Sequence, residues 1–156
     1  MAIRTIIKEG DPNLRKICRP VEKFDQRLWD LLDDLKDTLD YISGLGLASP
    51  QVNVLRRAVI VEYEDMFYEL VNPVLLHSEG ECFDNEGCLS VGDCRGIVKR
   101  PQKIEIEYFD RFGEKHNLKA EGYFARVILH EMDHLDGILF IDKMVRRIDT
   151  RRGRWK

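Results

Sequence analysis

The stretch "LHEMDHLDGILF", residues 129–140, holds two histidines and a glutamate in the spacing of a helical metal site. His130 and His134 are four residues apart, so their rings lie on one face of a helix, about one turn from each other. Glu131 is rotated by about 100° from His130, which suits it to take a proton from a water rather than to bind the metal. The stretch therefore predicts a metal-binding helix late in the chain.

The helical pattern begins near Tyr123 and continues to Leu135, and Gly137 is placed to end it. Tyr123 and Val127 extend the face that holds the histidines, so we expect them to form an apolar wall of the pocket. Short matches of this motif also occur by chance, and a buried histidine is more often a hydrogen-bonded core residue. The well-formed helix end favours the metal site.

The residues downstream of the helix do not supply an obvious third ligand. A catalytic site of this type has three protein ligands and one position left for water. The long form of the motif has a third histidine where this chain has Phe140, and no glutamate follows Glu131. Asp142 and Asp149 remain possible but stand in no recognisable motif. We therefore expect the third ligand upstream.

The best upstream candidate is "NEGCLSVGDCRG", residues 85–96. Cys88 follows a glycine and precedes a strand-like Leu-Ser-Val, so its thiolate could project from a tight turn. Cys94 is a second candidate, and spacing does not choose between the two. A thiolate beside two imidazoles suits Zn²⁺ or Fe²⁺.

The rest of the chain predicts an α+β fold in which antiparallel sheets pack around the C-terminal metal-binding HExxH helix. Residues 25–44 have apolar positions at helical spacing and predict an N-terminal amphipathic helix that ends at Gly44. A short helix over residues 11–21, stopped by Pro20, is expected before it. Extended segments, with Pro73 at a bulge or strand end, are expected at 57–63, 67–76 and 96–110, the last forming a hairpin with 112–122.

Length and composition are those of one ordinary globular domain, which we place at residues 1–147, with a basic tail at 148–156. Hydrophobic residues make up 44% of the 156 and charged residues 34%, and no apolar run approaches the roughly 20 residues that span a bilayer. The first ten residues lack a signal-peptide pattern, so we expect a cytoplasmic protein with no membrane partner. In that compartment the four cysteines are not expected to form disulfides.

Charge is unevenly distributed along the chain. Residues 143–156 hold seven Lys/Arg against one acid, whereas residues 1–142 hold 18 bases against 27 acids. A basic tail on an acidic body indicates a contact with a polyanion, such as nucleic acid or the ribosome. The alternative is a solvated tail without a partner.

Three segments together resemble peptide deformylase, the metal hydrolase that removes the N-formyl group from nascent bacterial proteins. They are "GLGLASPQ" at 44–51, "EGCLS" at 86–90 and "HEMDH" at 130–134, in the order that the family has them. The resemblance extends over essentially the whole chain. It implies N-formyl-Met peptides as substrate and one divalent metal ion as cofactor, Fe²⁺ by family, with Zn²⁺, Ni²⁺ or Co²⁺ also accepted by such ligands.

The resemblance also implies a role for individual residues. Glu131 is the expected catalytic acid and base, and the Gln51 amide and the backbone N–H of Leu89 are the expected oxyanion donors. Ser49 and Gly92 differ from the alanine and proline that are usual in the family. The expected metal ligands are Cys88, His130 and His134, and the expected substrate-binding residues are Gly44, Leu45, Gly46, Arg95 and Val127.

Three alternative interpretations account for less of the sequence. A small HExxH metallopeptidase leaves the Gln51 and Cys88 segments without a role. A closed structural metal site on an RNA-binding domain, with Cys82 or Cys94 as fourth ligand, fits the basic tail but does not require Glu131. A nucleotide cofactor is not expected, because Ser49 occupies the third glycine position of the dinucleotide fingerprint and the segment follows a helix.

Overall fold

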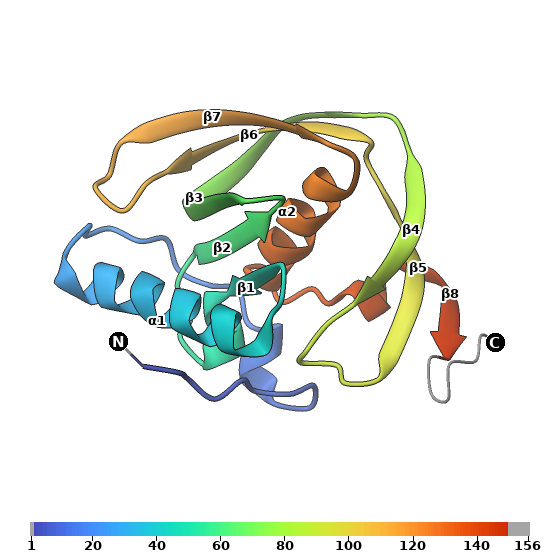
Figure 1. The fold of residues 1–156 in the computed structure, drawn as a ribbon, viewed down its shortest axis with the longest axis horizontal. Coiled ribbons are helices and arrows are strands. Elements are labelled where there is room, and N and C mark those ends of the chain that lie inside the picture. The colour runs from blue at the N-terminus through green and yellow to red at the C-terminus, as the bar shows by residue number, and fades with distance from the viewer. Residues whose placement is uncertain (1, 150–156) are drawn as a thin grey trace.

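The computed structural model describes residues 2–149, which form two antiparallel sheets and two α-helices (Figure 1). The predicted α+β class with antiparallel sheets is therefore confirmed. One sheet has the order β1-β2-β3-β6-β7, with bounds Gly46–Ala48, Ala58–Tyr63, Met66–Glu79, Lys103–Phe109 and Lys115–Glu121. The other has the order β4-β5-β8, with bounds Cys82–Gly87, Cys94–Arg100 and Met144–Asp149.

Helix α1 (Gln26–Ile42) lies along one face of the larger sheet. The Asp25 side chain caps its first turn by accepting a hydrogen bond from the backbone N–H of Leu28. Its C-terminal residue in the left-handed conformation is Ser43, with φ of 57°, and not the expected Gly44. The leucine positions at helical spacing are buried, and each such side chain contributes about 1.5–3 kcal/mol.

Helix α2 (Gly122–His134) carries the HExxH motif and packs against β1 and β2. Strand β2 contributes to both hydrophobic cores, because its side chains point alternately to the two faces of the sheet. Ala58 and Ile60 belong to the cluster with α1, whereas Val59 and Val61 belong to the cluster with α2. The sheet therefore fixes α2 relative to β1, and both elements border the cavity described below.

Helix α2 ends at His134 with Leu135 as its C-cap, so Gly137, which was expected to end the helix, instead ends the turn that follows it. Its φ is +73°, and a Cβ there would lie 2.3 Å from the backbone oxygen of Arg15. No other residue fits this position, since both the conformation and the space exclude a side chain. The close approach joins the N-terminal segment to the end of the metal-binding helix.

Two further sequence expectations were wrong in detail. The helix expected over 11–21 is a single 3₁₀ turn, Pro12–Arg15, because the backbone N–H of Cys18 donates to Leu135 instead of continuing a helix. The extended run at 96–110 is divided at Pro101, which places β5 and β6 in different sheets, so only β6 pairs with β7. Pro73 lies at the irregularity in the β3–β6 pairing, as expected.

Three strands were not anticipated, namely β1, β4 and β8. Strand β8 runs through Asp149, and residues 150–156 of the predicted tail lie outside the described residues. All four cysteines are free thiols, as expected. Between residues 2 and 149, no helix combines the length and apolar character that crossing a membrane requires.

Candidate metal and catalytic site

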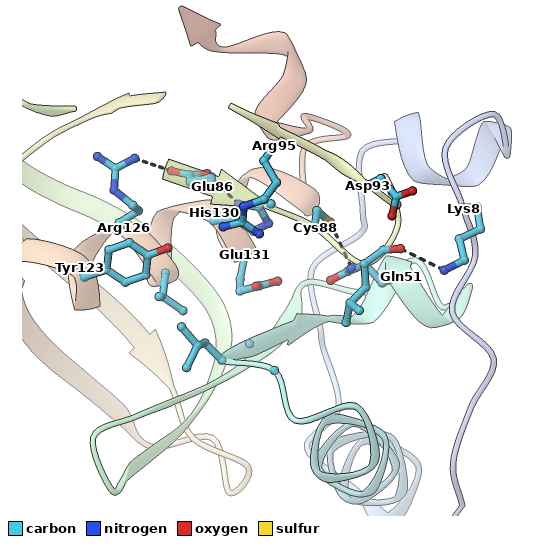
Figure 2. A pocket seen from close by; sticks show the side chains of 17 residues that line it. Lys8, Gln51, Glu86, Cys88, Asp93, Arg95, Tyr123, Arg126, His130 and Glu131 are labelled. Carbon is cyan, nitrogen blue, oxygen red and sulfur yellow. Dashed lines mark hydrogen bonds and ion pairs between the residues drawn. The ribbon is translucent and has the colours of Figure 1, made fainter. Parts of the chain in front are cut away.

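Helix α2 and the turn after β4 meet at a cavity of about 520 Å³. His130 and Glu131 come from α2, and Cys88 comes from the turn; Figure 2 shows these side chains converging on one region. The opposite rim comes from the segment between α1 and β1. The predicted substrate-binding residues Gly44, Leu45, Gly46, Arg95 and Val127 all line this cavity.

Cys88, His130 and His134 each offer one ligand atom, and the three atoms lie within 4.8 Å of one another. Cys88 Sγ and His134 Nε2 are 3.5 Å apart. Zinc-type bonds of about 2.3 Å to sulfur and about 2.05 Å to nitrogen, at a tetrahedral angle, also place these two atoms about 3.5 Å apart. The donor set therefore fits a single divalent cation.

No fourth protein ligand joins this set among residues 2–149. Cys82 pairs with Arg100 at the far end of the β4–β5 hairpin, and Cys94 begins β5, paired with β8. A closed structural site with either cysteine as fourth ligand is therefore not what the described part of the chain forms. Three donors with one open position are the arrangement of a catalytic metal site.

Glu86 fixes the orientation of the His130 ring by a hydrogen bond to its Nδ1. His130 Nδ1 lies 2.8 Å from Glu86 Oε1, so this nitrogen carries the proton and the other ring nitrogen is left for the site. Glu86 is 3% exposed and also accepts two hydrogen bonds from Arg100 and one from Arg126. Burial raises the pKa of Glu86, but the hydrogen bonds from Arg100 and His130 outweigh it and hold the pKa far below its usual value.

The two histidines differ in their electrostatic environment. Burial and the charge of His130 lower the pKa of His134 well below its ordinary value, which keeps His134 neutral and able to bind a metal. Burial also opposes the charge of His130, but its hydrogen bonds with Cys88 and Glu86 outweigh this and raise its pKa to about 10.

Glu131 is buried, and its Oε1 has no hydrogen-bond partner within the described chain. Burial raises the pKa of Glu131 to about 7, which is where a general acid and base works best near neutral pH. Gly46 leaves room for this carboxyl, because a Cβ there would lie 2.8 Å from both Cγ and Oε2 of Glu131. The glycine therefore lets β1 approach the acid and base closely.

Gln51 is held in one orientation by two neighbours. Its Oε1 accepts a hydrogen bond from the backbone N–H of Ala48 at 3.0 Å, so its Nε2 points the other way, toward Ser90 Oγ at 3.2 Å and Cys88 Sγ at 3.6 Å. The backbone N–H of Leu89 meets no acceptor in the described residues. The Gln51 amide and the backbone N–H of Leu89 therefore both lie next to Cys88, and they are the candidate oxyanion donors.

Sequence reasoning missed several residues of the site. Lys8, from the N-terminal segment, donates to the carbonyl of Leu89 at 3.0 Å, and no sequence signal connects positions 81 residues apart. Ser90 and Glu86 lie inside the quoted EGCLS motif, where their polar character was the available signal. Figure 2 shows Lys8 and Gln51 on the same side of the pocket, opposite Tyr123 and Arg126.

The two departures from the family pattern have different surroundings. Ser49 is fully buried, and its hydroxyl donates to the carbonyl of Val54 at 2.5 Å, so it stabilises the turn after β1. Gly92 lines the cavity with φ of +76°, a conformation that proline cannot adopt. The loop after Cys88 therefore follows a path that needs this glycine.

The family model of polypeptide deformylases matches residues 3–149. The chain belongs to this family. It is 52% identical to a peptide deformylase of Caldicellulosiruptor bescii over 159 residues, which cover 99% of this chain and 96% of that relative. It is 46% identical to one of Acetivibrio thermocellus, covering 96% and 88%. The crystal structure of the deformylase of Thermotoga maritima matches with a TM-score of 0.89 at 35% identity, covering 91% of this chain and 97% of that one.

Membership in the deformylase family makes the chain a metal-dependent hydrolase that removes a formyl group. The match includes all three quoted motifs, since they lie between residues 44 and 134. It favours a deformylase over a generic small metallopeptidase. The cavity described above is therefore the candidate active site of a deformylase.

Proposed function

We propose that this chain removes the formyl group from N-formylmethionine at the start of nascent polypeptides and that Cys88, His130 and His134 hold its one divalent cation. The observation that carries this assignment is the convergence of three metal donors, the buried Glu131 and two hydrogen-bond donors on one cavity. The cation is Fe²⁺ by family, and the same donor set accepts Zn²⁺, Ni²⁺ or Co²⁺. When bound there, it lowers the pKa of a coordinated water toward about 7 and polarises the formyl oxygen.

Glu131 moves the proton in this mechanism. It takes a proton from the attacking water and passes it to the nitrogen of the departing amine, while formate leaves. Its raised pKa, about 7, makes both transfers accessible near neutral pH. Its unpartnered Oε1 is the atom available for this role.

Gln51 and Leu89 stabilise the negative charge that develops on the formyl oxygen. Gln51 supplies its amide Nε2 and Leu89 its backbone N–H, and both are fixed before the reaction begins. Loss of one such donor typically costs a factor on the order of 10²–10³ in rate.

The substrate backbone is expected to add as an extended strand beside β1. Among residues 2–149, β1 is an edge of its sheet and pairs with β2 alone. Apart from the Ala48 N–H, which donates to Gln51, its other side can take backbone hydrogen bonds from a peptide. The methionine side chain then meets the apolar wall formed by Val127, and Leu45 contributes from the rim with 45% of its surface exposed. Arg95 borders the same cavity and donates to Asn85 at 3.0 Å, which positions its guanidinium.

The decisive experiment compares the wild-type chain with Glu131→Gln. The variant should keep its metal, measured by elemental analysis, but should release formate from formyl-Met peptides about 10²–10⁴-fold more slowly. Acetyl-Met peptides and internal peptide bonds are the control substrates and should not be cleaved. Wild-type formate release by the variant, or cleavage of internal bonds by the parent, would show the assignment to be wrong.

We also propose that the basic C-terminal segment contacts the ribosome and that the enzyme works in the cytoplasm, where nascent chains carry the formyl group. The segment's charge supports this, and its last seven residues lie outside the described chain. Ending the chain after Asp149 should leave activity on short peptides intact and weaken ribosome binding most at low salt. Unchanged ribosome binding by the shortened chain would contradict the proposal.

A further inference from the structure

A second cavity, of about 460 Å³, lies at the N-terminal end of α1. Its apolar floor is formed by Val21, Leu28, Leu31 and Val54. The C-terminal end of α1 leads to Gly44 at the active-site rim, and the 17 residues of the helix span about 25 Å between the two sites. In Figure 1 the C-terminal end of α1 lies nearer to α2 than its N-terminal end does.

Four cations and two carboxylates border this cavity: Arg4, Lys23, Arg27, Arg56, Glu22 and Asp25. Arg4 is paired with Asp34 at 2.7 Å, and Asp25 caps α1. The charges of these two lining residues are therefore already engaged within the protein.

The remaining cations, Lys23, Arg27 and Arg56, have no hydrogen-bond or ion-pair partner for their side chains among residues 2–149. Arg56 is half-buried, so its unpaired guanidinium has lost part of its hydration without compensation. Several other arginines among residues 2–149 are paired, as Arg57 is with Asp136 and Arg111 with Glu69. Three unpaired cations therefore gather on a body in which acids outnumber bases by 27 to 18.

We propose that this cavity binds a single-stranded RNA segment. The guanidinium groups of Arg27 and Arg56 match the geometry of phosphate oxygens. Lys23 and Arg27 flank the start of α1, whereas Arg56 comes from the segment before β2, so cations from two segments can meet more than one phosphate. The apolar floor can accept one unstacked base, against which an arginine plane can stack. Glu22 can accept a hydrogen bond from a ribose hydroxyl or a base amino group of RNA. The carboxylate side chains of an acidic peptide have no such donor to offer Glu22.

The test measures binding of a fluorescent 12-nucleotide single-stranded RNA to the full chain between 0.05 and 0.3 M salt. The variant Arg27→Gln/Arg56→Gln removes two phosphate contacts, each of which contributes about 0.7 to the slope of log K against log salt. We expect the slope to fall by about 1.4, which is about 25-fold weaker binding at 0.1 M salt if both proteins bind equally at 1 M. The matched control, Lys115→Gln/Lys119→Gln on β7, removes the same charge and should keep most of the affinity.

Three results would overturn the RNA site. They are no RNA binding by the wild-type chain at 0.1 M salt, an equal loss in the two double variants, and binding of poly-glutamate as tight as that of RNA. Both variants retain the basic C-terminal segment, so a difference between them reports on the cavity. Formate release should be unaffected by Arg27→Gln/Arg56→Gln, which confirms folding and separates this proposal from the proposed function.

Discussion

Replacing Glu86 by glutamine should destabilise both the fold and the metal site. The carboxylate receives four hydrogen bonds, two from Arg100 and one each from Arg126 and His130. The substitution changes almost no volume, so its effect measures charge and hydrogen bonding. Arg100 keeps its ion pair with Asp133 at 2.7 Å, but Arg126 keeps only backbone carbonyls.

Removing one partner of a buried ion pair typically costs about 3–5 kcal/mol, because the other charge stays buried without compensation. For a chain of this size each kcal/mol shifts the melting temperature by about 2–4 °C, so we expect a decrease of about 6–20 °C. His130 also loses the carboxylate that orients its ring. Mutation of a residue that hydrogen-bonds a metal ligand typically weakens metal binding about 10–100-fold.

The assays are urea unfolding and a competition titration against a metal-binding dye. The matched control is Glu81→Gln, the same chemical change at a side chain that is 66% exposed and 3.8 Å from Lys99. An exposed pair of this type contributes at most about 1 kcal/mol, so the control should unfold near the wild-type urea midpoint. The reasoning fails if Glu86→Gln unfolds as late as this control and binds metal as tightly as the wild-type chain.

Three further predictions follow from the described contacts. Ser90→Ala removes the acceptor that orients Gln51, so kcat should fall by less than the roughly 10²–10³ expected for losing Gln51 itself, with little change in KM. Burial raises the pKa of Asp34, but hydrogen bonds from Arg4 and from a backbone N–H outweigh it and lower the pKa below 3.8. Its stabilisation is therefore present above pH 3.8 and is lost as the pH falls through the lowered pKa. The difference in unfolding free energy between wild type and Asp34→Asn should be present at about pH 6 and should shrink as the pH is lowered below 3.8. Leu39→Ala, in the α1 core, should cost about 2–5 kcal/mol in urea unfolding without changing metal affinity.

The sequence predicted the helices where apolar residues repeat at one regular spacing over several turns. The leucines of α1 and the apolar positions of α2 repeat at helical spacing over several turns, so their existence follows from the residues alone. Strand β1 has only three residues and β8 carries charge, so neither has a readable period. At Pro101 a readable pattern was misleading instead. The alternating pattern continues past this residue, but the chain passes there from one sheet to the other.

Much of the candidate site could be predicted because most of its residues lie in three sequence motifs. The contacts between segments that are distant in the sequence could not be predicted. Lys8 reaches Leu89 across 81 residues, and Gly46 makes room for Glu131 across 85. Both contacts depend on how the sheet places β1 and the N-terminal segment beside α2. Pattern and spacing describe one element at a time, so they give no distance between elements.

The choice of Cys88 over Cys94 nevertheless has a signal in the sequence, which is the spacing of Glu86 and Cys88. Alternate residues of an extended chain point the same way about 6.7 Å apart, and residues four apart on a helix face lie about 6 Å apart along its axis. When an E-x-C segment runs beside an H-x-x-x-H helix, the glutamate can therefore contact one histidine while the cysteine contacts the other. The structure has this pairing, with Glu86 at His130 and Cys88 at His134. Cys94 has no acid two residues before it that could take the Glu86 position, since residue 92 is glycine.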